Sequence, residues 1–150
     1  MRAIIQKVKR AKVTVEDNII GEIAKGFLVL LAVHENDTED DLNYILKKVS
    51  KLRVFEDEND KMNLSIQDIK GEFLIVSQFT LYGDVRKGNR PSFSESAKLE
   101  KANKYYEIFV DRLKRQTGLN VQTGKFQAHM EVELVNDGPV TIQLDSSKLY

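Results

Sequence analysis

The chain has 150 residues, of which 41% are hydrophobic, and its 23 basic residues balance 23 acidic ones. These values are typical of one globular domain, so we expect a single domain over residues 1–150. The balanced charge excludes a uniformly basic nucleic-acid-wrapping protein, and the lack of cysteine excludes disulfides, thiolate metal sites and thiol nucleophiles. The longest apolar run, residues 27–33, is too short to span a bilayer, and the charged N-terminus is unlike a signal peptide, so we expect a soluble cytoplasmic protein.

The first third of the chain predicts β structure. Residues 3–8 are rich in strand-forming side chains, residues 12–15 alternate, and residues 19–23 return after a turn at 16–18 as the second arm of a hairpin. Residues 27–33 form the continuous apolar run expected of a strand that is buried on both faces.

Two helices are predicted from apolar residues at helical spacing. Asp37 or Thr38 can cap the first helix. Its apolar positions are Leu42, Ile45, Leu46 and Val49. The second helix is predicted to begin near Ser94 and to end at Gly118, a natural C-terminal cap.

The remaining segments add an acidic loop at 56–60 and a strand at 72–81 that ends in polar residues. Two final strands, residues 130–135 and 140–144, are expected to be joined by a turn at 136–139. About seven or eight strands with two long helices, and no regular strand–helix alternation, predict an α+β fold with a mostly antiparallel, barrel-like sheet.

A segment with polar side chains, residues 77–80, follows the apolar run of residues 73–76. Ser77 or Thr80 could act as a nucleophile or hydrogen-bond donor at a pocket rim, and Gln78 could orient a carbonyl group. The alternative is an ordinary strand end that satisfies its own backbone, and the spacing alone favours this structural interpretation.

Residues 136–139, Asn-Asp-Gly-Pro, have the composition of a turn. Pro139 fits a plain turn less well, because it opens a predicted strand and cis peptide bonds occur mainly before proline. A cis bond would aim the carbonyl groups of Gly138 and Pro139 in fixed directions. The sequence alone favours a structural turn, and a functional role for the turn remains the alternative.

Two groups of basic residues could bind phosphates. The first, Arg86, Lys87 and Arg90, lies in a loop with glycines. The second lies at the N-terminus, without any acidic residue, and comprises Arg2, Lys7, Lys9, Arg10 and Lys12. Each group could equally be a solvated face.

His34 and His129 stand alone, without the spacing of a histidine metal site. The chain also has no Gly-x-Ser-x-Gly motif, phosphate-binding loop or dinucleotide-binding glycine motif. We therefore expect neither a metal ion nor a cofactor.

Residues 77–80 and 136–141 closely resemble two motifs of the D-aminoacyl-tRNA deacylase family. Other segments resemble the family in the same order and spacing, namely residues 1–3 leading into 6–8, 52–57, 61–65, 81–84, 86–88 and 90–93. The resemblance extends over nearly the whole chain.

This resemblance implies a homodimeric hydrolase that cleaves the ester between a D-amino acid and the 3′ end of tRNA, with active sites at the subunit interface. The bond between Gly138 and Pro139 would be cis and would reach into the other subunit's pocket, where the carbonyl groups make an L side chain clash. Glycyl-tRNA, which has no side chain to clash, would be a second substrate. The ester is already activated and the ribose 2′-OH can assist, so the protein needs mainly orientation and oxyanion-type donors.

The family pattern assigns four residues to the catalytic pocket: Ser77, Gln78, Phe79 and Thr80. It places residues 126–130 beside the terminal adenosine. The substrate- and tRNA-binding residues would be Phe126, Met130, Asn136, Arg86, Lys87 and Arg90. Thr80 could attack covalently or only position groups, and we favour positioning because no base is visible to activate its hydroxyl.

The chain departs from the family pattern at one point. Family members usually have Thr-Gly-x-Phe-Gly-Ala before the last strands, whereas here Phe126 is followed by Gln127. A side chain at this position could narrow a site at which glycine allows close approach.

Two other classes of protein remain as alternatives. One is a non-catalytic RNA-binding module that uses the basic loop, and the other is a dimeric scaffold in which the Gly-Pro turn is architectural. An assay with a D-aminoacyl-tRNA distinguishes the three classes. Loss of the ester supports the enzyme, binding without loss supports the RNA-binding module, and neither supports the scaffold.

Overall fold

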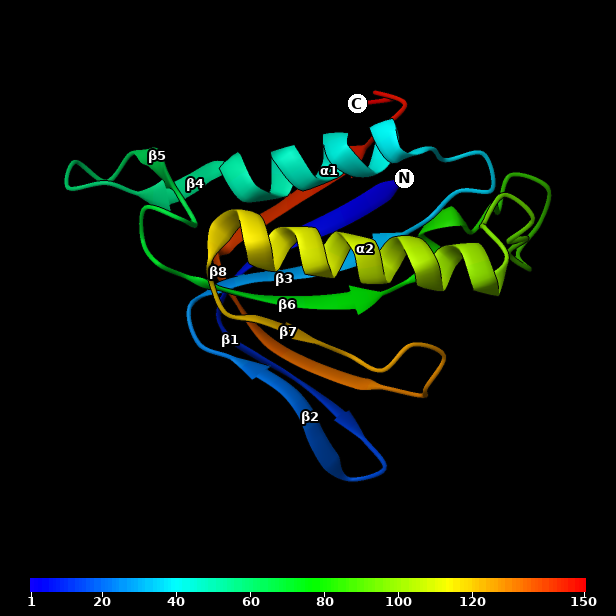
Figure 1. Ribbon diagram of the computed structural model, residues 1–150, viewed down its shortest axis with the longest axis horizontal. Coiled ribbons are helices and arrows are strands. Elements are labelled where there is room, and N and C mark those ends of the chain that lie inside the picture. Colours follow the sequence, from blue (N-terminus) through cyan, green and yellow to red (C-terminus); the bar gives the residue numbers. More distant parts are fainter.

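Two helices lie against one side of a strongly curved mixed sheet in the computed structural model, which describes residues 1–150 (Figure 1). The strands are β1 (Arg2–Val15), β2 (Asn18–Ile23), β3 (Gly26–Ala32), β4 (Arg53–Glu56), β5 (Met62–Ser65), β6 (Glu72–Ser77), β7 (Val121–Thr123) and β8 (Glu131–Asp145). The helices are α1 (Glu39–Lys51), α2 (Leu99–Thr117) and a short 3₁₀ turn, η1 (Phe79–Tyr82). This confirms an α+β fold with a nearly closed, barrel-like sheet.

The long strand β1 connects the sheet. It pairs with β3 along its first half, with β2 along its second half, and with β8 on its other side, always antiparallel. Glu16 and Asp17, both with positive φ, make the tight turn of the predicted β1–β2 hairpin. β3, β6 and β7, by contrast, are parallel neighbours, so the sheet is more mixed than the sequence indicates.

Alternation along β6 separates two apolar cores. Phe73 and Ile75 belong to the larger core, which includes the buried faces of both helices, and Leu74 and Val76 belong to the smaller one. β6 is buried on both faces, and it reaches a cavity only at its end, at Val76 and Ser77.

The helix starts differ in part from the sequence prediction. Thr38 is the N-cap of α1, whereas Asp37 is buried and accepts a hydrogen bond from the α-amino group of Met1. α2 begins at Leu99 rather than near Ser94, because Ser94 and Glu95 form a turn, Ser96 forms an antiparallel bridge with His34, and the Ala97 N–H donates to the Val33 carbonyl at 2.9 Å. The predicted end at Gly118 is confirmed by its left-handed conformation.

The predicted turn between two final strands is wrong, because β8 is one strand of 15 residues whose two halves both pair with β1. Asn136 pairs with Val8 and Thr141 with Gln6, so residues 137–140 bulge opposite the single residue Lys7. The local composition of a turn is here the composition of a bulge, which a neighbouring strand holds in line.

Neither α1 nor α2 combines the length and the apolar composition that a membrane-spanning helix needs.

Candidate active site

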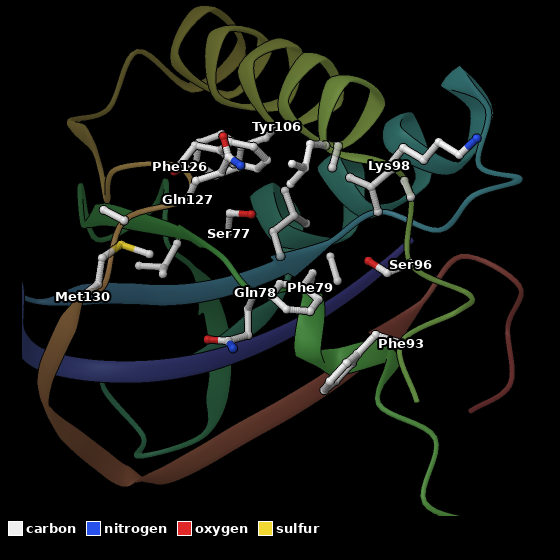
Figure 2. Close-up of a pocket in the computed structure, with 18 of the residues that line it drawn as sticks. Ser77, Gln78, Phe79, Phe93, Ser96, Lys98, Tyr106, Phe126, Gln127 and Met130 are labelled. Atoms are coloured by element: carbon white, nitrogen blue, oxygen red, sulfur yellow. The ribbon is translucent and has the colours of Figure 1, made fainter. Parts of the chain in front are cut away.

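A pocket of about 570 Å³ opens between the ends of β3 and β6, the N-terminal half of α2 and the segment that leads into β8 (Figure 2). Most of its lining residues are hydrophobic. Its polar side chains belong to Ser77, Gln78, Ser96, Lys98 and Gln127, besides the hydroxyl of Tyr106. A concave apolar site with few polar groups is typical of small-molecule binding.

The end of β6 forms one wall. The Gln78 N–H donates to the Leu31 carbonyl at 2.8 Å, and the chain then turns into η1. Ser77 lies at the centre of the pocket in Figure 2. Phe79 is 53% exposed and packs edge-on against Phe93, with ring centroids 5.1 Å apart. Predicted residues Ser77, Gln78 and Phe79 therefore lie together on this wall.

Thr80, the fourth predicted catalytic residue, is exposed and is not among the lining residues. Its hydroxyl oxygen accepts a hydrogen bond from the Gln78 side-chain amide. Thr80 therefore does not contact the cavity directly, and the Gln78 side chain connects the two.

The opposite wall brings together Phe126, Gln127 and Met130 (Figure 2). The ring of Tyr106 on α2 lies 6.1 Å from that of Phe126, and its hydroxyl donates to the Ile75 carbonyl at 2.7 Å. Burial raises the pKa of Tyr106 well above its ordinary value, so this hydroxyl stays protonated. The hydrogen bond ties α2 to β6 two residues before Ser77.

Three predicted residues lie outside this pocket: Gly138 and Pro139 on the β8 bulge, and Asn136 directly before it. Gly138 and Pro139 are exposed, and the peptide bond between them is cis, as the resemblance implies. The Asn136 side-chain amide donates to the Thr141 hydroxyl at 3.3 Å, while its carbonyl oxygen is buried without a partner. The three residues therefore do not complete the pocket of their own chain.

The basic loop also lies outside the pocket. Arg86 makes two hydrogen bonds to the Asp84 carboxylate, at 2.9 and 2.8 Å, and this contact lowers the pKa of Asp84 to about 2. Lys87 and Arg90 are exposed and take part in no ion pair. The loop therefore offers two uncommitted cations rather than three.

The basic N-terminal group is mostly not a free surface. Lys7 is buried and bound to Glu56, Arg2 is paired with Asp145, and Lys12 with Glu133. Lys9 and Arg10 remain exposed.

Several lining residues carried no functional signal in the sequence. Tyr106, Ser96 and Lys98 all fell inside the second predicted helix, the last two because the helix begins at Leu99 and not near Ser94. Phe93 lies in a segment noted only for its resemblance to the family. His129 is exposed and does not line the pocket, and no group of three or more His, Asp or Glu side chains is arranged to hold a metal ion.

Known proteins match this chain over most or all of its length. Residues 4–145 match the family model described as D-Tyr-tRNA(Tyr) deacylase. Proteins named D-aminoacyl-tRNA deacylase from Clostridioides difficile and Thermotoga petrophila are 60% and 59% identical to this chain over 150 residues, with complete coverage of both sequences.

Solved structures match the fold over nearly all of its length. One, described as a c-Myc DNA unwinding element binding protein, has a TM-score of 0.92 and is 42% identical to this chain. The match includes 97% of this chain and 98% of the other chain. Another, described as a probable eukaryotic D-amino acid tRNA deacylase, has a TM-score of 0.83 at 18% identity, with 96% and 98% of the two chains covered, and shares the fold. On the family model and its full-length relatives, the chain belongs to the D-Tyr-tRNA(Tyr) deacylase family.

Proposed function

We propose that this protein hydrolyses the ester bond of D-aminoacyl-tRNA and releases free tRNA and a D-amino acid. One observation carries the proposal: residues 77–79, and residues 126–128 with Met130, are far apart in sequence and form the two walls of one apolar pocket. The full-length relatives named D-aminoacyl-tRNA deacylase support this assignment.

In this reaction, water adds to the acyl carbon, the bond between that carbon and the ribose 3′ oxygen breaks, and a proton passes to the ribose oxygen. The ester is already activated, and the neighbouring ribose 2′-OH can assist as an internal nucleophile or base. The protein then needs to hold the ester in place and to stabilise the negative charge on its carbonyl oxygen.

The start of η1 supplies donors suited to that charge. The N–H groups of Phe79 and Thr80 open this short turn and donate no backbone hydrogen bond. We assign them to the oxyanion, with Ser77 as a hydrogen-bonding group inside the pocket. The titratable side chains on the wall are Lys98 and Tyr106, and neither is hydrogen-bonded to Ser77 or Thr80. This supports a positioning role for Thr80, exerted through Gln78.

Chiral selection is assigned to the Gly138–Pro139 turn of a second subunit. Both residues are exposed and lie outside their own chain's pocket, which is the arrangement a cross-subunit role requires. In a homodimer, the turn would fill the open side of the partner's pocket and leave no room for an L side chain. Glycyl-tRNA has no side chain to exclude, so it would also be hydrolysed.

The tRNA end would lie along the second wall. Phe126 offers a ring beside the cavity for the terminal adenosine, and Met130 borders the same space. Lys87 and Arg90 would meet phosphates farther along the acceptor end. Asn136, which directly precedes the β8 bulge, would act through the shape of the turn.

The first test compares D-tyrosyl-tRNA and L-tyrosyl-tRNA, with ester loss followed over time. Selective loss of the D ester is expected. Binding without loss would identify an RNA-binding module, and neither binding nor loss would leave a scaffold; both outcomes contradict the proposal.

The cross-subunit arrangement is tested with mixed dimers of Phe79→Ala and Gly138→Ala chains. If each site combines one chain's pocket with the other chain's turn, a mixed dimer contains one site in which both parts are intact, and activity returns on mixing. A site built within one chain stays defective in both subunits, so unrestored activity in confirmed mixed dimers would refute the arrangement.

A further inference from the structure

Gln127 has a backbone conformation that side chains rarely adopt, at the mouth of the pocket. Its φ is +66°, in the left-handed region. The other non-glycine residues with positive φ are Glu16, Asp17, Asp60, Lys70 and Lys148, and none of them lines the pocket. Residues held in disfavoured conformations cluster at ligand-binding sites.

The local turn explains how this conformation is held. The Ala128 N–H donates to the Lys125 carbonyl at 3.1 Å, which closes a four-residue turn with Gln127 in its third position. When that position has positive φ, glycine is the usual residue. The turn therefore accepts glutamine against the backbone preference, although glycine would serve the turn better.

The side chain of Gln127 is exposed and free to bind. Its carboxamide lies beside Phe126 in Figure 2, and it makes no hydrogen bond within the chain. The other amide on the pocket wall, that of Gln78, donates to Thr80. Gln127 thus offers an uncommitted donor and acceptor next to an aromatic ring.

We propose that Gln127 determines specificity for the base at the 3′ end of the tRNA, by reading the edge of adenine through its carboxamide. This inference rests on the proposed function of the pocket. A glutamine amide matches adenine in two hydrogen bonds, because its oxygen accepts from the N6 amino group and its nitrogen donates to N7. Proteins that read single-stranded RNA ends commonly stack a base on an aromatic side chain, here Phe126, and read its edges with polar groups.

The test measures binding, so that it does not depend on turnover. The probes are a 3′-(D-tyrosylamido) analogue of adenosine, which cannot be hydrolysed, and the same analogue of purine riboside, which lacks the N6 amino group. The Kd of each is measured by calorimetry for the wild-type protein and for Gln127→Gly. Glycine suits the backbone of this turn, so the variant is expected to fold.

We expect the wild-type protein to prefer the adenosine analogue by about tenfold, within the range that a bidentate base contact provides. Gln127→Gly should bind the adenosine analogue more weakly, so that the two analogues have about the same Kd. Gln116→Ala, which alters an exposed glutamine on α2 outside the pocket, should keep the wild-type preference.

An equal preference in wild type and Gln127→Gly would overturn the inference, as would a failure of the adenosine analogue to bind the wild-type protein. A protein that shows the adenine preference but does not hydrolyse D-tyrosyl-tRNA would instead refute the proposed activity. The two failures are therefore distinguishable.

Discussion

Lys7 is a charged side chain that the fold removes from solvent. It is 1% exposed, and its ammonium group donates to both carboxylate oxygens of Glu56 at 2.7 Å and to the Val54 carbonyl at 3.2 Å. Ala3 and Ile5 occupy the same buried face of β1, so the strand's alternation places Lys7 inward. The expectation that Lys7 belongs to an exposed basic surface is wrong, because the two-residue period of the strand points this side chain inward despite its charge.

Replacing Glu56 by Gln is expected to destabilise the fold, because a neutral amide compensates the buried ammonium less well. The hydrogen bond from Lys7 lowers the pKa of Glu56, so its contribution is present above the ordinary glutamate pKa and is lost as pH falls through the lowered value. Urea unfolding should show a smaller free energy of unfolding for the variant at pH 7 and converging values below about pH 4.

Glu58→Gln, on the adjacent exposed loop, is the control and should match the wild type at both pH values. Equal stability of Glu56→Gln and wild type at pH 7 would show that the Val54 carbonyl alone satisfies Lys7.

His129 lies in sequence between two lining residues, Ala128 and Met130, yet it is exposed and does not line the cavity. His129→Ala is therefore expected to retain most of the deacylase activity on D-tyrosyl-tRNA. A loss of about a hundredfold or more in kcat, the scale of general-base removal, would place histidine in the mechanism.

At the scale of elements, β8 combines strand pairing with a local bulge that aims two residues outward. Gly138 has φ +116°, and a Cβ there would lie 2.9 Å from Val140 Cγ2. The bulge thus depends on glycine for its shape, while β1 holds the strand on both sides of it.

Gly138→Ala is expected to leave a folded protein with a displaced turn. A displacement of about 1 Å in a positioning group can cost roughly a hundredfold in rate, so we expect that loss on D-tyrosyl-tRNA, or reduced rejection of the L ester. Gly118→Ala, also at positive φ but with open space around it at the end of α2, should lose stability and keep activity.

The melting temperatures of both variants are measured together with their rates, because an unfolded variant would lose activity for an unrelated reason. A well-folded Gly138→Ala protein with the wild-type rate and D/L ratio would assign the bulge to architecture alone.

At the scale of the whole molecule, net charge is zero, so tRNA binding depends on where cations remain free. Arg86 is held by Asp84, whereas Lys87 and Arg90 are exposed without ion pairs. The surface charge available to phosphates is thus decided by pairing within the fold.

Replacing Lys87 and Arg90 together by Ala is expected to weaken tRNA binding and to reduce the slope of log K against log salt by about 1.5, the value for two phosphate contacts. Arg86→Ala should change the slope less. Lys47→Ala with Lys51→Ala, on α1, removes the same charge and should leave the slope unchanged. An unchanged slope in the loop variant would make this loop a solvated face.

The sequence by itself determined the features that depend on local pattern: the apolar face of α1, the end of α2 at Gly118, the β1–β2 hairpin and the motifs that indicate the family. It also placed Ser77 at the polar end of a buried strand. These follow from backbone geometry and side-chain period within about ten residues, which neighbouring residues largely decide.

Tertiary structure alone decided how distant segments meet. Parallel pairing of β3, β6 and β7 brings the end of β6 to the segment that follows β7, and this juxtaposition forms the pocket between Ser77 and Phe126. Pairing with β1 on both sides of the bulge made β8 one strand, and the approach of Glu56 on β4 gave the buried Lys7 its partner. Long-range pairing and burial depend on residues far apart along the chain, so local periodicity carries no record of them.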